Sequence, residues 1–126
     1  MTGVQTCALP ILFHLTTQSV NTSSNIESVA ISPLALISIV ILAPLVEELV
    51  FRYAAINILS RKFNKSGCIL VSSLFFSIMH FDFPFVFGYF LIGLVLAAIY
   101  VRTNRLIVSF VVHASMNLIV VMFQIS

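Results

Sequence analysis

Three ionisable side chains stand together inside an apolar run that extends from residue 31 to residue 59: Glu47, Glu48 and Arg52. The chain has only six Lys or Arg and four Asp or Glu, so three of its ten charged residues lie here. A charge at membrane depth costs a few kcal/mol and by default marks a functional site. Glu48 and Arg52 are spaced to pair on one helical face. Glu47 lies about 100° around the helix and needs another partner.

Polar residues at helical spacing also interrupt two later apolar segments. His113 and Asn117 are four residues apart, so both can face one cavity. Phe76 and His80 have the same spacing, which sets the ring beneath the imidazole. A single buried histidine is most often structural, but here two histidines, two glutamates, an arginine and an asparagine lie in the apolar segments of a chain that is only 8% charged.

Counting along each helix from the basic loop at its end predicts which of these residues meet. Glu47, His80 and Asn117 all lie roughly 20–21 Å from such a loop, at about 1.5 Å per residue. A second layer, roughly 14–15 Å from the loops, contains three more residues: Arg52, His113 and Phe76. We therefore expect Glu47, His80 and Asn117 to share one depth.

A carboxylate and an imidazole can activate water, and a second imidazole and an amide can stabilise an oxyanion. The same side chains can instead bind a divalent metal such as zinc, with Glu47, His80 and His113 as candidate ligands. The sequence leaves both possibilities open. It has no HExxH motif, no aspartate pair and no convincing acyl nucleophile with its base.

The composition restricts the class of protein. Sixty per cent of the residues are hydrophobic and 8% are charged, which is typical of a multi-span membrane protein whose partner is the lipid bilayer. The net charge of +2 is too small to indicate nucleic acid as a partner.

The apolar segments predict an all-α, multi-span transmembrane helical bundle with four spans. Their expected ranges are about 31–60, 66–82, 84–101 and 104–125, within a core of residues 29–126. Pro44 should kink or locally open the first span beside the glutamates. Gly88 and Gly93 should allow close helix approach in the third span.

Five Lys or Arg residues lie in the loops 61–65 and 102–105, and the loops on the other side contain none. The positive-inside rule therefore predicts that these two loops are cytoplasmic. The C-terminus should then face outward.

The first eleven residues resemble a translated sequencing adapter, and we exclude them from the fold. If that interpretation is right, the chain is an N-terminally truncated fragment. Residues 12–28 would then be the remnant of a preceding helix, followed by a polar loop.

The ordered motifs EExxxR at Glu47, FxxxH at Phe76 and HxxxN at His113 resemble those of the CPBP intramembrane proteases. This family contains CAAX prenyl endopeptidases and bacteriocin-processing, Abi-type proteins. The resemblance covers residues 32–124 and implies a multi-pass protein of the cell membrane, in bacteria. Its substrate would be a peptide or a prenylated protein.

The resemblance also implies roles for the catalytic residues. Glu47 would be the general base, with His80 as its partner on the attacking water, and His113 and Asn117 would form or support the oxyanion hole. Glu48 would hold Arg52, and Phe76 would support the site. The family is often labelled a metalloprotease, which keeps a metal as a second possibility and leaves no cofactor certain.

Two other classes of function compete with an intramembrane endopeptidase. One is a non-catalytic membrane protein of the same family, acting in bacteriocin self-immunity or as a scaffold. The other is a proton-coupled transporter that uses the buried Glu and His as a relay. Four unequal spans give little sign of the inverted repeats that a transporter would show.

Overall fold

The computed structural model describes residues 27, 30 and 32–125, and this part of the chain is helical without strands. The adapter-like residues 1–11 lie outside the described residues, as does all of 12–28 except Glu27. Three helical runs are long and apolar enough to cross a membrane: Pro33–Leu59, Phe83–Thr103 and Leu106–Gln124. The all-α membrane helical bundle is thus confirmed.

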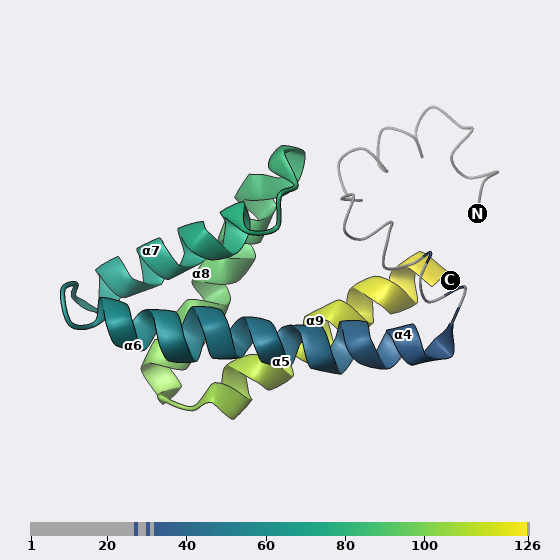
Figure 1. The fold of residues 1–126 in the computed structure, drawn as a ribbon, viewed down its shortest axis with the longest axis horizontal. Coiled ribbons are helices and arrows are strands. Elements are labelled where there is room, and N and C mark those ends of the chain that lie inside the picture. Colours follow the sequence, from purple (N-terminus) through teal and green to yellow (C-terminus); the bar gives the residue numbers. More distant parts are fainter. Residues whose placement is uncertain (1–26, 28–29, 31, 126) are drawn as a thin grey trace.

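The first run is a single rod that lies along the longest axis of the molecule (Figure 1). Pro33 suits its first turn, where the missing N–H costs nothing. Two π-type segments interrupt the rod, one on each side of the turn that carries the glutamates. Its parts, in order, are α4 (Pro33–Ile37), η1 (Ser38–Leu42), α5 (Ala43–Glu48), η2 (Leu49–Ala54) and α6 (Ala55–Leu59).

Pro44 opens the rod locally instead of bending it sharply. The N–H of Ala43 donates to the carbonyl of Ser38, five residues back, so the turn before Pro44 is wider than an α-helical turn. The rod continues almost straight through α5 (Figure 1). Of the two outcomes expected from this proline, the local opening is the one that occurs.

The second apolar helix, α7 (Lys65–Ile78), is shorter than its expected range of 66–82. Asn64 caps its start by accepting a hydrogen bond from the N–H of Gly67 at 2.8 Å. After Ile78 the chain turns through Phe81, whose φ of 52° is left-handed. Fourteen residues span roughly 21 Å, less than the hydrocarbon thickness, and they place His80 in the turn beyond the helix.

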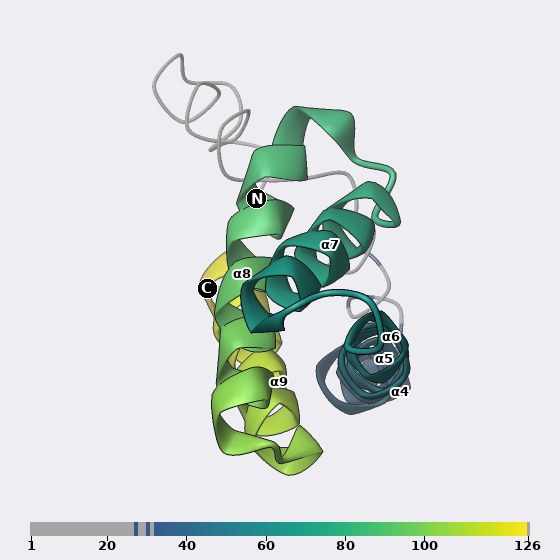
Figure 2. The ribbon, with the colours of Figure 1, turned by 90° about the vertical axis from the view of Figure 1, so that its left-hand side faces the viewer.

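Two long helices complete the bundle. A short 3₁₀ turn, η3 (Phe83–Phe85), leads into α8 (Val86–Thr103). Asn104 ends α8 in the left-handed conformation, with φ 53°, and its N–H donates to the carbonyl of Tyr100. Helix α9 (Leu106–Ile125) follows. Seen along the rod, α7, α8 and α9 lie on one side of it (Figure 2).

Of the two glycines expected to allow close helix approach, Gly93 lies in such a contact. A Cβ on Gly93 would lie 3.1 Å from Cδ1 of Phe76 and 3.2 Å from the backbone of Ser73, so α7 and α8 need a glycine there. A Cβ on Gly88 would meet no described atom within 4 Å, so the described residues place no helix against it. Gly88 stands near the start of α8, where α7 has already ended.

Candidate active site

Glu48, Arg52 and His113 form a closed cluster at the centre of the bundle. The Glu48 and Arg52 side chains are fully buried, and Arg52 Nε lies 3.5 Å from Glu48 Oε2. His113 Nδ1 is 2.8 Å from Glu48 Oε1 and, because a carboxylate accepts, the ring donates from Nδ1. One carboxylate therefore holds a cation from its own helix and an imidazole from α9. The expected pairing of Glu48 with Arg52 is present.

Two further groups hold the guanidinium of Arg52 in this cluster. Nη2 donates to the carbonyl of Gly93 at 3.4 Å, and the guanidinium carbon lies 4.6 Å from the centre of the Phe76 ring. Phe76 is itself almost completely buried. Phe76 thus supports the arginine as well as the imidazole of His80, whose ring centre lies 4.5 Å away.

Glu47 lies on the open side of the same helical turn. Its side chain is 29% exposed, whereas that of Glu48 is 0% exposed. Glu47 Oε2 is 3.4 Å from His113 Nε2 and 3.9 Å from His80 Nε2. Within the described residues, this oxygen has no hydrogen-bond partner. Two imidazole nitrogens thus face one carboxylate oxygen.

The ring of His80 is oriented by its own turn. Nδ1 lies 2.6 Å from the carbonyl of Phe76, four residues back in the last turn of α7. A carbonyl only accepts, so Nδ1 carries the proton and Nε2 is the acceptor in the neutral ring. This capping contact also helps to end α7 before His80. The lone pair of Nε2 therefore points towards Glu47.

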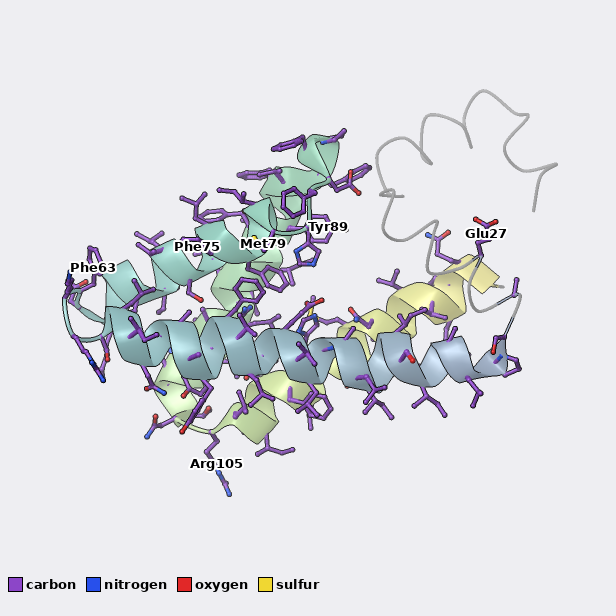
Figure 3. All side chains as sticks on the ribbon, in the orientation of Figure 1. Glu27, Phe63, Phe75, Met79, Tyr89 and Arg105 are labelled. Atoms are coloured by element: carbon purple, nitrogen blue, oxygen red, sulfur yellow. The ribbon has the colours of Figure 1, made fainter. Side chains whose placement is uncertain are left out.

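Tyr89 of α8 stacks on His80 and was missed by the sequence reasoning. The ring centres are 4.1 Å apart and the planes differ by 23°. Figure 3 shows Tyr89 near the end of α7 marked by Met79. The depth count would have found this residue, because Tyr89 is 15 residues from Asn104, roughly 22 Å.

The structure corrects the predicted layers. His113, expected in the layer of Arg52, contacts both Glu47 and Glu48, because its two ring nitrogens face the two carboxylates. Asn117, expected beside Glu47, instead donates from Nδ2 to the carbonyl of Ile39 at 3.0 Å. A count of 1.5 Å per residue predicts the depth of a Cα atom, not the direction or reach of its side chain.

The candidate metal ligands agree with zinc in type, since two imidazoles and one carboxylate converge: Glu47, His80 and His113. Over residues 27, 30 and 32–125, however, no group of three or more His, Cys, Asp and Glu side chains is arranged to hold a metal ion. The donor types fit a metal ion, but their arrangement in the described residues does not.

The chain belongs to the type II CAAX prenyl endopeptidase Rce1-like family, which it matches over residues 29–119. All seven candidate site residues lie within that range. The family resemblance inferred from the three motifs is thus confirmed.

The chain is also similar to three bacterial proteins. The chain is 32% identical, over 90% of its length and 47% of the relative's, to "Putative membrane peptidase YdiL" of Bacillus subtilis. It is 34% identical to "Membrane-embedded CAAX protease MroQ" of Staphylococcus aureus, over 74% of the chain and 40% of the relative. It is 33% identical to "UPF0177 protein YxdF" of Lactococcus lactis, over 62% of the chain and 43% of the relative.

The chain thus spans less than half the length of these relatives. No solved structure matches it. Family membership and the apolar helices together identify a membrane protein of a protease family.

Proposed function

We propose that this chain carries the catalytic site of an intramembrane endopeptidase that cleaves a peptide bond with water activated by Glu47 and His80. The observation that carries the proposal is the separation of 3.9 Å between Glu47 Oε2 and His80 Nε2. This distance is too long for a direct hydrogen bond and suits two acceptors that share one water molecule. The Glu47 side chain is 29% exposed while its Oε2 is buried between the two imidazoles, whereas the Glu48 side chain is fully enclosed.

In the first step, Glu47 takes a proton from the water while the water oxygen attacks the scissile carbonyl carbon. The new C–O bond forms as the carbonyl π electrons move to the oxygen, which becomes an oxyanion. Glu47 then gives the proton to the leaving nitrogen as the C–N bond breaks. The products are a carboxylic acid and an amine, so atoms and protons balance without a further reactant.

The closed cluster supports this chemistry by orienting His113. Glu48 accepts from Nδ1 and thereby directs Nε2 towards the reacting centre, as a carboxylate does for a histidine in other hydrolytic sites. A His113 ring that carries both protons can donate from Nε2 to the oxyanion. Arg52 balances the charge of Glu48 in the interior.

We infer the substrate class from the family and from the position of the site. A peptide bond of a prenylated protein or of a bacteriocin or leader peptide, entering from the bilayer, fits a site surrounded by apolar helices. MroQ is named as a CAAX protease, which favours the first class. We place the loops 61–65 and 102–105 in the cytoplasm, because they carry five of the six basic residues.

The test is cleavage of fluorogenic peptides, with and without a prenyl-cysteine, by the chain reconstituted in liposomes. We expect cleavage by the parent chain and a loss of about 100-fold or more in kcat for His80→Ala. Ser115→Ala is the matched control, because Ser115 is exposed and, among the described residues, donates to the carbonyl of Val111 in its own helix. Equal cleavage by all three would exclude the proposal. A parent chain that inserts and cleaves no peptide would favour the non-catalytic immunity or scaffold function.

A further inference from the structure

Asn117 contacts a backbone carbonyl for which the rod offers no donor at the usual positions. In an α-helix the carbonyl of Ile39 would accept from the N–H of Ala43, but that N–H donates to Ser38 instead. One residue further on, in the π register, stands Pro44, which has no N–H. The Nδ2 of Asn117 donates to this carbonyl at 3.0 Å from the neighbouring helix α9.

A side chain from another helix also binds a carbonyl of the second π-type segment. The N–H of Ala55 donates to the carbonyls of Val50 and Arg52 and so bypasses that of Phe51. The hydroxyl of Ser72, fully buried on α7, donates to the Phe51 carbonyl at 2.6 Å. In an apolar interior an unpaired carbonyl is costly, so both side chains satisfy a group that the widened turns release.

We propose that Asn117 is a positioning residue, which anchors the turn opened by Pro44 to α9 and so sets the direction of Glu47. The inference rests on the proposed function for its catalytic meaning. It differs from the oxyanion role expected for Asn117, because the amide donor is committed to Ile39 and faces the rod.

Helix geometry explains why such an anchor matters. Each residue turns an α-helix by about 100°, so a change of register in η1 would rotate the following turn α5 and its carboxylate relative to α4. Asn117 lies one turn after His113 on the same helix. The anchor therefore also fixes the separation of 3.4 Å between His113 Nε2 and Glu47 Oε2.

The test is a cycle of Asn117→Ala and Pro44→Ala, each alone and combined, in the full chain in liposomes. Pro44→Ala introduces a backbone N–H that lets the rod satisfy its own carbonyls. We expect Asn117→Ala to lower kcat by about 10- to 100-fold in the parent, as misplacement of a reacting group does. In the Pro44→Ala background the further loss should be less than about threefold. An equal loss in both backgrounds would overturn the inference and assign the amide to the substrate.

A second measurement separates this inference from the proposed function. Infrared spectra of the chain with an isotope-labelled Ile39 carbonyl report the hydrogen bond without any substrate. Asn117→Ala should move that band to higher frequency in the parent, and Ser115→Ala should leave it in place. An unchanged band in Asn117→Ala would show that there is no anchor, whether or not the chain cleaves peptides. A shifted band with no peptidase activity would instead retain the anchor and reject the proposed function.

Discussion

Two neighbouring residues of one helical turn have opposite surroundings in this bundle. The closed side contains Glu48, Arg52 and one ring nitrogen of His113; all are buried, and Glu48 is paired with both of the others. The open side contains Glu47, with 29% of its side chain exposed, and His80, with 17% exposed. A rotation of about 100° per residue is enough to send one carboxylate inward and the next to a partly exposed position.

We propose that the two sides have different roles, one structural and one chemical. A buried ion pair contributes little net stability, but removing one partner leaves an uncompensated charge. The closed side is therefore suited to hold His113 in one orientation. We propose Glu47 as the base because, of the two carboxylate side chains, that of Glu47 is partly exposed and its Oε2 has no hydrogen-bond partner among the described residues.

The largest expected effect on folding comes from breaking the closed side. Glu48→Ala leaves Arg52 buried without its carboxylate, and we expect it to lower the free energy of unfolding by about 3–5 kcal/mol. Glu47→Ala, at the partly exposed position, should change it by about 0.5 kcal/mol or less. SDS titrations of the chain in mixed micelles measure both changes in the free energy of unfolding. Equal losses for the two variants would remove the distinction.

A smaller loss of folding free energy is expected from a substitution where α7 and α8 meet behind the closed side. The Cβ of Gly93→Ala would press on the Phe76 ring and on the backbone of Ser73, which costs about 1–3 kcal/mol. Gly88→Ala is the matched control in the same helix and should cost nothing, since its Cβ enters open space among the described residues. If Gly93→Ala were as stable as Gly88→Ala in the same titration, that result would contradict this packing.

The smallest effect concerns the open side, where Tyr89 supports His80 by ring stacking. Loss of such a pair is worth about 0.5–1.5 kcal/mol, so Tyr89→Leu should lower kcat by up to about tenfold. Tyr89→Phe retains the ring and should stay within about twofold of the parent. Peptide cleavage in liposomes measures both. If Tyr89→Phe lost as much activity as Tyr89→Leu, the hydroxyl would matter and the stacking would not.

The apolar periodicity and the charge pattern were sufficient to predict the helices, the membrane class and the pairing of Glu48 with Arg52. Local rules were sufficient for the opening at Pro44, because a proline removes a donor wherever it stands in a helix. They did not show that a π-type turn would release the carbonyl of Ile39 or that Asn117 would donate to it.

The other differences between the predicted and the observed structure have the same cause. The end of α7 depends on the contact of His80 with the Phe76 carbonyl, and the place of His113 between two carboxylates depends on the direction of its ring. Gly88 and Gly93 are equivalent in sequence, and only the path of α7 distinguishes them. Such features depend on side-chain directions and on where neighbouring helices end, which helical spacing alone does not define.

We propose that Glu47 acts as the general base and that Glu48 orients the site. The most direct test compares Glu47→Gln with Glu48→Gln, in liposomes for peptide cleavage and in SDS titrations for stability. We predict that Glu47→Gln lowers kcat by about 10²- to 10⁴-fold at unchanged stability, because an amide cannot accept the proton. Glu48→Gln should instead unfold at lower SDS. Cleavage by Glu47→Gln at the parent's rate would show that Glu47 is not the general base.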